Sequence, residues 1–429
     1  MNITVVALGK IGLPLAVQFA TRGHLVTGAD VNEALVEQVN AGVEPFPGEA
    51  HLAEYLAEVV ADGRLVATTD TTSAVARSEA VVIVVPLFVD ADGNPDFGWM
   101  DDATKAIAAG LQPGTLVSYE TTLPVGTTRT RFAPMLEAGS GLTVGKDFHL
   151  VFSPERVFTG RVFADLRAYP KLVGGVDAES AKRGQAFYEA VLTFDDRPDL
   201  SRPNGVWDLG SAEAAEMAKL AETTYRDVNI GLANQFARFA ATHGIDVHQV
   251  IEASNSQPFS HIHRPGMAVG GHCIPVYPRL YLFNDPDATI VRAAREANAG
   301  MPAYTVGVLE GAHGELRGQR VLVLGASYRG GVKESAFSGV FAAVSALRER
   351  GAEVVVDDPM YTAGELSALG LPPYEKGSAV DAAILHTDHA AYRALTAADL
   401  PGVRTLVDGR GALDPANWPD VTVRTLGRG

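Results

Sequence analysis

The residue with the clearest chemical potential in this sequence is its single cysteine, Cys273. It lies in a segment, residues 264–275, that reads RPGMAVGGHCIP and is rich in glycine. A thiolate is a strong nucleophile, and glycines such as Gly271 leave space for a substrate carbon to approach the sulfur. The adjacent His272 could help to activate the thiol. The alternative is a buried structural cysteine, which is the commoner role for this residue type.

Two further charged residues lie in apolar surroundings. Lys219 and Thr223 are four residues apart in a helical pattern, so they share one helix face. Lys219 could act in the interior, or it could only extend its ammonium to solvent. Glu155 follows an apolar strand pattern that ends at Phe152, and doubly wound folds place chemistry at the carboxyl ends of strands. Taken alone, a glutamate there is more often a surface charge.

A dinucleotide signature follows the first apolar run. The turn ALGKIG, residues 7–12, connects a strand to a helix, as the Rossmann fingerprint requires. Gly9 would let a pyrophosphate approach and Gly12 would let the helix pack closely, although Ala7 replaces the first glycine. Asp30 ends the second strand, where a carboxylate accepts hydrogen bonds from a ribose and repels a 2'-phosphate, so NAD is predicted rather than NADP. The predicted cofactor-binding residues are Gly9, Lys10, Ile11, Gly12 and Asp30. The alternative is that these glycines only form a tight turn.

The elements that position these residues alternate along the chain. Apolar strand patterns separated by helices predict an α/β fold with two doubly wound, Rossmann-like domains joined by a long central helix. The expected strands are 3–8, 25–29, 80–85, 115–119, 148–152, 321–324, 353–356 and 382–385. The residues 195–209 break the pattern with prolines and charges. Ser211 is the expected N-cap of the central helix and Gly244 its stop.

Composition narrows the class of protein. A formal charge of −16 and a pI of about 5.1 would repel a nucleic acid or an anionic membrane, so neither is expected as a partner. The longest apolar run, 80–89, is too short to span a bilayer, and no basic stretch precedes the first strand, so we expect no signal peptide. One cysteine cannot form an internal disulfide, which favours the cytoplasm. No metal site is expected.

Six ordered motifs carry a resemblance to a known family. They are residues 9–16, 124–128, 153–157, 219–222, 270–275 and 387–389, which read GKIGLPLA, PVGTT, SPERV, KLAE, GGHCIP and TDH. Together they resemble the UDP-glucose/GDP-mannose dehydrogenase family, and more closely its branch that oxidises UDP-N-acetylhexosamines. The resemblance covers nearly the whole chain.

The resemblance implies an architecture and a reaction. It implies an NAD-binding domain (1–200), a central helical domain with the cysteine loop and the homodimer contact (201–315), and a C-terminal domain that binds a nucleotide sugar (316–429). It implies oxidation of the C6 hydroxyl to the uronate, with a thiohemiacetal and a thioester on Cys273. We then expect the thiol to face the nicotinamide across a cleft.

The same resemblance implies roles for individual residues. Lys219 would stabilise the oxyanion, Glu155 would activate water, and Thr122 would hold a water molecule near the reacting carbon. The predicted substrate-binding residues are Arg264, Arg329, Thr223 and Gly271.

Four positions depart from the family pattern. Tyr277 replaces an aspartate, and a phenol cannot replace a carboxylate as a base at neutral pH. Thr223 replaces an asparagine, Ala336 an arginine of the nucleotide site, and residues 87–88 (Leu-Phe) a Thr-Pro pair. The replacement of the aspartate by Tyr277 puts in doubt the proton transfers of the oxidation and hydrolysis steps.

Two other functions therefore stay open. Partial oxidation to the aldehyde, or transient oxidation as in an epimerase, is favoured by Tyr277. The presence of Cys273 in its glycine-rich segment opposes both. A protein that binds NAD or a nucleotide sugar without catalysis is the alternative from a different class.

Overall fold

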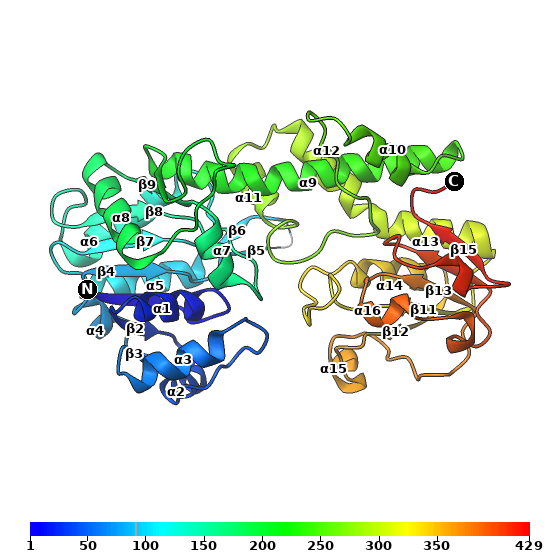
Figure 1. Cartoon of the computed structure of the whole chain (residues 1–429), viewed down its shortest axis with the longest axis horizontal. Coiled ribbons are helices and arrows are strands. Elements are labelled where there is room, and N and C mark those ends of the chain that lie inside the picture. The colour runs from blue at the N-terminus through cyan, green and yellow to red at the C-terminus, as the bar shows by residue number, and fades with distance from the viewer. Residues whose placement is uncertain (91) are drawn as a thin grey trace. The chain divides into compact units, whose positions relative to one another are not determined.

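The computed structural model of the protein describes residues 1–90 and 92–429, and its internal contacts divide the chain into two units, Met1–Ala221 and Glu222–Gly429. Figure 1 shows the elements of each unit. The second unit begins within the long helix α9.

The first unit is built on an eight-stranded sheet. Its strand order is β3-β2-β1-β4-β7-β8-β9-β10, in which only the β8–β9 pair is antiparallel. The six strands up to β8 therefore follow the Rossmann order 3-2-1-4-5-6. The strands of this unit are β1 (Asn2–Val6), β2 (Leu25–Ala29), β3 (Leu65–Thr68), β4 (Ala80–Ile83), β7 (Leu116–Tyr119), β8 (His149–Phe152), β9 (Lys171–Gly175) and β10 (Val206–Asp208), with a separate hairpin of β5 (Phe88–Val89) and β6 (Pro95–Asp96).

Both faces of this sheet are buried. Ile3 and Val5 of β1 join the core formed with α1, α3, α7 and α8, and the alternating residues Thr4 and Val6 point to the opposite face and are also buried. The helical elements are α1 (Gly12–Thr21), α2 (Glu33–Asn40), α3 (Leu52–Ala61), α4 (Thr71–Val75), α5 (Gly98–Gly110), the π-helix η1 (Thr128–Phe132), α6 (Ala133–Ser140), α7 (Val162–Ala168) and α8 (Ala178–Val191). Burial on both faces explains why the strands are apolar runs rather than alternating patterns.

The long helix α9 (Ala212–Thr242) has the ends that the sequence predicts. The side chain of Ser211 accepts the backbone N–H of Ala214 at 3.1 Å, and Gly244 takes a left-handed conformation with φ 66°. Figure 1 shows it as the longest helix of the chain.

The second unit contains a five-stranded parallel sheet of order β12-β11-β13-β14-β15. This is the doubly wound order 2-1-3-4-5, whose topological switch point lies between β11 and β13. The strands are β11 (Arg320–Leu324), β12 (Glu353–Asp357), β13 (Ala382–Leu385), β14 (Thr405–Asp408) and β15 (Thr422–Thr425). The remaining helices are α10 (Val247–Ser254), α11 (Tyr277–Asn284), α12 (Thr289–Ala299), α13 (Met301–His313), α14 (Val340–Glu349), α15 (Ala363–Ala368), α16 (Ala390–Arg393), η2 (Ala397–Asp399) and η3 (Pro415–Asn417).

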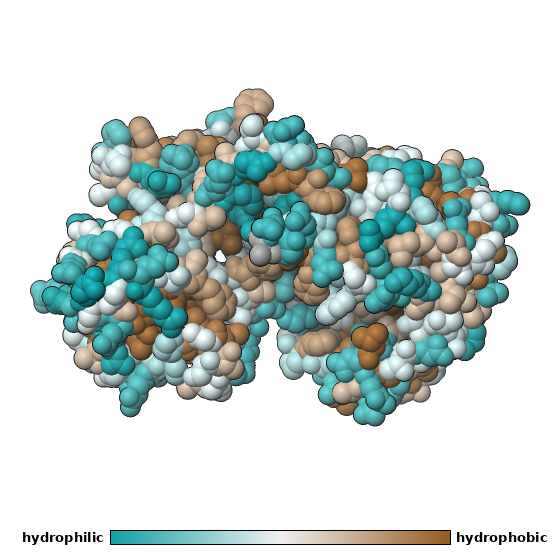
Figure 2. Space-filling view, turned by 180° about the vertical axis from the view of Figure 1, so that it is seen from behind, coloured by the Kyte–Doolittle hydropathy of each residue, from teal (hydrophilic) through white to brown (hydrophobic). Residues whose placement is uncertain are grey.

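The fold class expected from the sequence is confirmed, and all eight expected strands are present with boundaries shifted by no more than a few residues. The first sheet extends past the expected domain boundary at residue 200, because β10 pairs with β9. Among the described residues no helix is long and apolar enough to cross a membrane. The face of the molecule in Figure 2 carries hydrophilic and hydrophobic residues intermixed.

Candidate active site

The glycine turn after β1 is shaped for a dinucleotide. A side chain at Gly12 would meet the carbonyl oxygen of Ala7 at 1.9 Å, so only glycine lets α1 start this close to the strand. At Gly9 no heavy atom lies within 4 Å of the position of an added Cβ, which leaves room for a pyrophosphate. Ala7 itself adopts the left-handed conformation (φ 74°) that glycine favours. The substitution at the first glycine position is therefore accommodated with strain.

Asp30 ties this turn to the end of β2. Its carboxylate accepts the backbone N–H of Leu8 at 2.7 Å and that of Asn32 at 2.9 Å. Carboxylate oxygens have further lone pairs that ribose hydroxyls could use. The exposed Lys10 and the half-buried Ile11 lie in the turn itself. These residues fit NAD, with the room above Gly9 as the decisive observation.

Thr122 and Glu155 follow the adjacent strands β7 and β8. Thr122 is buried, and the side chain of Glu155 is only 10% exposed. The surface-charge interpretation of Glu155 is therefore excluded. Both residues lie beyond the carboxyl ends of parallel strands, where doubly wound folds bind their substrates.

Sequence reasoning missed the partners of Glu155. The ammonium of Lys171, at the start of β9, donates to Glu155 and also to Glu120, the latter at 2.9 Å. Burial raises the pKa of Glu120 to about 8, whereas the pKa of Glu155 is lowered because the charges of Lys171 and Lys219 outweigh its burial. The sequences around Lys171 and Glu120 gave no indication that these two side chains meet.

Lys219 on α9 belongs to the same neighbourhood. It is 9% exposed, and its charge acts on the carboxylate of Glu155. The interpretation that Lys219 only extends to solvent is therefore wrong. Thr223 lies one turn further along α9 and is also buried. The structure thus brings together two of the predicted catalytic residues, Lys219 and Glu155.

The start of α9 is attached to the PVGTT motif. Glu216 accepts the backbone N–H groups of Gly126 and Thr128 at 2.5 and 2.9 Å, and the Thr128 hydroxyl at 2.6 Å. Gly126 has φ 88°, which favours glycine at this position. The motif therefore has a structural role: it anchors, through Glu216, the helix that carries Lys219.

Cys273 in the second unit is exposed and free of disulfides. The interpretation as a buried structural cysteine is therefore wrong. Its carbonyl oxygen accepts the N–H groups of Val276 and Tyr277 at 3.2 and 2.9 Å, so the residue sits in the turn that leads into α11. The Nε2 atom of His272 lies 3.5 Å from a carboxylate oxygen of Glu334, a contact that the sequence did not suggest.

The two glycines before Cys273 have a different role from the one that the sequence suggested. An added Cβ on Gly270 would meet the Cβ of Tyr328 at 2.6 Å, and one on Gly271 would meet the Tyr328 ring at 3.0 Å. The N–H of Gly271 also donates to Ala336 at 3.0 Å. The missing side chains therefore make room for the loop after β11, rather than for a substrate at these Cβ positions.

A buried ion pair fixes the other side of the cysteine loop. Arg295 of α12 donates to both carboxylate oxygens of Asp227 on α9, at 2.5 and 2.7 Å, and to the carbonyl of Pro275 at 3.2 Å. Arg279 donates to the same carbonyl at 3.3 Å. Because Asp227 is fully buried, this bidentate pair is a rigid support for the loop.

The loop after β11 lies at the switch point of the second sheet. Asp358 accepts the N–H groups of Ala326 and Ser327 at 2.8 and 2.9 Å, and His389 contacts the same carboxylate at 3.1 Å. These amides are therefore already bonded within the protein. Arg329 is exposed in this loop.

Arg264 and Arg410 are further arginines of this unit. Arg264 is exposed at the start of the cysteine segment. Arg410, which sequence reasoning missed, donates to the carbonyls of His386 and Tyr328 at 2.6 and 3.3 Å. Burial lowers the pKa of Arg410, and the charges of Asp388 and Asp408 oppose this shift. It follows Asp408-Gly409 at the end of β14, a strand that the sequence did not reveal.

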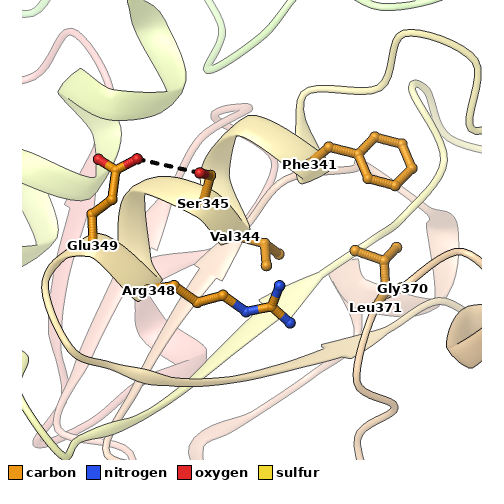
Figure 3. A pocket seen from close by; sticks show the side chains of 7 residues that line it. All are labelled: Phe341, Val344, Ser345, Arg348, Glu349, Gly370 and Leu371. Carbon is orange, nitrogen blue, oxygen red and sulfur yellow. Dashed lines mark hydrogen bonds between the residues drawn. The ribbon is translucent and has the colours of Figure 1, made fainter.

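The surface hollows lie apart from these residues. One hollow of about 400 Å³ lies along α14, where Phe341, Val344 and Leu371 contribute apolar side chains and Ser345 donates to Glu349 (Figure 3). Another of about 550 Å³ is lined by residues of α6 and its neighbours, among them Arg129 and Asp177. Neither contains a predicted site residue. Residues 1–90 and 92–429 contain no group of three or more side chains that could hold a metal ion.

Comparison with known proteins agrees with this architecture. Two curated proteins similar to this chain are named UDP-N-acetyl-D-mannosamine dehydrogenase. The protein from Pyrococcus horikoshii is 35% identical over 92% of this chain and 91% of its own. The protein from Escherichia coli K12 is 34% identical over 71% of this chain and 70% of its own. A solved structure of the UDP-D-ManNAc dehydrogenase from Pyrococcus horikoshii superposes with a TM-score of 0.87 and 31% identity over the full length of both chains. A structure of the UDP-N-acetyl-mannosamine dehydrogenase from Staphylococcus aureus superposes with a TM-score of 0.85 and 29% identity, over 100% of this chain and 99% of its own.

Three profiles of one family match successive parts of the chain. The NAD binding domain matches residues 1–192, the central domain 213–300 and the UDP binding domain 322–415. The resemblance inferred from the motifs is confirmed, as is NAD as the cofactor. The chain is an NAD-dependent nucleotide-sugar dehydrogenase and belongs to the UDP-glucose/GDP-mannose dehydrogenase family.

Proposed function

We propose that this enzyme oxidises C6 of a UDP-N-acetylhexosamine to the uronate, with UDP-N-acetyl-D-mannosamine as the first substrate to test. The curated relatives that cover more than nine tenths of the chain carry that name. The observation that carries the proposal is the exposed thiol of Cys273 on a loop anchored from both sides. A two-step oxidation to an acid needs such a nucleophile, whereas a one-step oxidation does not.

The mechanism assigns one task to each residue. The Gly9 turn would hold NAD, and each of the two oxidations would transfer one hydride to a separate NAD molecule, so that two NADH form per sugar. The sulfur of Cys273 adds to the C6 aldehyde, and Lys219 stabilises the oxyanion of the resulting thiohemiacetal. After the second oxidation, Glu155 removes a proton from a water molecule positioned by Thr122. That water forms a C–O bond, the C–S bond breaks, and the sulfur leaves as a thiolate.

Cationic residues of the second unit would bind the nucleotide. Arg264 and Arg329 are exposed, so each could bind diphosphate oxygens, and the guanidinium of Arg410 bonds to backbone carbonyls beside them. Thr223 and Gly271 would contact the sugar. Ala336 lacks the charge that the family pattern places there, so we expect a weaker or altered nucleotide contact.

Tyr277 favours a second candidate function. Without a carboxylate at this position, release of the acid could be slow and the product could be the aldehyde, as in a partial oxidation or an epimerase-like cycle. The two functions differ in the number of NADH molecules formed per sugar: two for the uronate, and one or none for the alternative.

We further propose that the enzyme is a cytoplasmic homodimer with the three domains expected at 1–200, 201–315 and 316–429, the first of which is extended to include β10. The dimer contact is supported by an exposed apolar stripe on α9. It comprises Tyr225, Leu232, Phe236 and Phe239, which are 57%, 45%, 37% and 59% exposed. Their spacing of seven, four and three residues places them on one helix face. Such a face is typical of an interface between helices.

The deciding experiment counts NADH and identifies the product for a panel of UDP-N-acetylmannosamine, UDP-N-acetylglucosamine, UDP-glucose and GDP-mannose. Two NADH and a uronate from one of the UDP-N-acetylhexosamines are expected. Cys273→Ala should form no uronate. No reduction of NAD with any sugar of the panel would contradict the proposal.

A further inference from the structure

A cluster of buried charged groups adjoins Glu155. Lys171 is 5% exposed, Glu120 2% and Tyr188 fully buried. The ammonium of Lys171 donates to both carboxyl groups, and the Tyr188 hydroxyl donates to the other oxygen of Glu120 at 2.5 Å. The side chain of Ser118 lies 2.7 Å from the Tyr188 hydroxyl. Three strands and one helix therefore contribute polar groups to one interior site.

Lys171 donates to both carboxyl groups, and its single charge cannot neutralise two ionised carboxylates. Lys219 acts on Glu155, so an ionised Glu120 would share the charge of Lys171 with Glu155 in an interior that strongly disfavours excess negative charge. Two carboxyl groups that share one cation relieve this charge when one of them is protonated. Glu120 is the deeper of the two, and the cation that acts on it is Lys171, whereas Glu155 also feels the charge of Lys219. The arrangement favours a protonated Glu120 and an ionised Glu155 at neutral pH.

We propose that Lys171 and Glu120 are positioning residues for thioester hydrolysis: Lys171 holds the Glu155 carboxylate in place, and Glu120 carries the proton that limits the pair to one negative charge. The inference rests on the proposed function, because it gives Glu155 the task of activating water. It also explains how this enzyme could keep a working base although Tyr277 supplies no carboxylate.

The groups that face Glu155 come from each element packed around it. They are Lys171 on β9, Glu120 after β7 and Lys219 on α9, and Tyr188 on α8 faces Glu120. Removing the charge of Lys171 should raise the pKa of Glu155, because an ammonium within hydrogen-bond distance lowers a carboxyl pKa by about 1 to 3 units. A purely structural cluster would change stability but not the ionisation of the catalytic base.

The first test measures kcat for uronate formation against pH in Lys171→Met and Lys171→Arg. Activity is lost when Glu155 becomes protonated, so this acid limb should move to higher pH by about one unit or more in Lys171→Met. Lys171→Arg retains the charge and should restore the limb to near its wild-type position. Lys105→Met is the matched control, since Lys105 is an exposed lysine of the same unit that pairs with Asp102 at 2.9 Å instead. An unmoved limb in Lys171→Met overturns the inference.

The second test does not need turnover. The infrared difference spectrum between the wild type and Glu120→Gln should contain the carbonyl band of a protonated carboxyl at pH 6, and the band should disappear as the pH rises through about 8. An ionised Glu120 at pH 6 overturns the inference even if the enzyme forms uronate. If the wild type reduces NAD with none of the tested sugars, the proposed function is overturned instead. The infrared result then still decides the inference.

Discussion

The aromatic ring of Tyr328 occupies the space in which a side chain on Gly271 would lie, with ring carbons 3.0–3.3 Å from the position of its Cβ. The nucleophile loop and the loop after β11 are therefore packed against each other within the second unit. The loop that carries Arg329 can thus influence the position of Cys273.

Gly271→Ala should disturb this packing. The new Cβ would press on Tyr328 at a residue with φ 91°, and left-handed strain alone costs about 1–2 kcal/mol. We expect a loss of stability of that order and an altered rate of Cys273 alkylation by iodoacetamide. The control is Gly307→Ala in α13, where no heavy atom lies within 4 Å, and which should be neutral or stabilising by up to about 1 kcal/mol. Unchanged stability and alkylation in Gly271→Ala would contradict the role of this contact.

Tyr277→Asp tests whether the lost carboxylate limits the reaction. If Tyr277 slows acid release, the aspartate should increase uronate formation at least about tenfold, towards the roughly 10²-fold or more that a positioned acid–base group contributes. The measurement is single-turnover uronate release followed by mass spectrometry of the acylated enzyme. Tyr277→Phe, which removes only the hydroxyl, should not increase the rate. An equal rate in both variants would show that another residue has taken over proton handling.

Ala7→Gly should stabilise the protein. Ala7 is left-handed at φ 74°, and glycine removes strain of about 1–2 kcal/mol at an entropic cost of about 0.4–1 kcal/mol. We expect a gain of about 1 kcal/mol in denaturant unfolding and no weaker NAD binding. At Ala41, which ends α2 with φ −80°, the same exchange should destabilise the protein, because no strain exists there to relieve. A loss of stability in both variants would refute the strain argument.

Changing Leu232 and Phe239 to glutamate should dissociate the proposed dimer. Two charges in an apolar contact would be desolvated without partners, so light scattering after gel filtration should give the monomer mass. The control is Phe259→Glu, since Phe259 is 91% exposed and lies outside α9. A wild type that is already monomeric would contradict the interface itself.

The sequence reveals those parts of the fold that depend on local pattern. The strands buried on both faces are uninterrupted apolar runs, and α9 has a serine cap and a glycine stop within its own sequence. Strands β9 and β14 escaped prediction because Lys171 and Asp408 make them less apolar, and their positions are set by neighbours in the sheets.

The site was predictable only where a motif carries its chemistry. Cys273, Lys219 and Glu155 stand in recognisable motifs, whereas Glu120 and Lys171 gain their meaning from each other across two strands. The role of Gly271 was misread for the same reason, because Tyr328 comes from a distant part of the chain. Long-range contacts of single side chains leave no periodic signal in a sequence.

Because Cys273 is exposed, oxidants can inactivate the enzyme at its sulfur. A sulfenic acid formed on this sulfur has no second thiol in the chain with which to form a disulfide, so its repair depends on an outside reductant such as a small thiol. Further oxidation to the sulfinic acid is irreversible without a dedicated repair enzyme. Inactivation by peroxide and its reversal by added thiol therefore report directly on one atom of this enzyme.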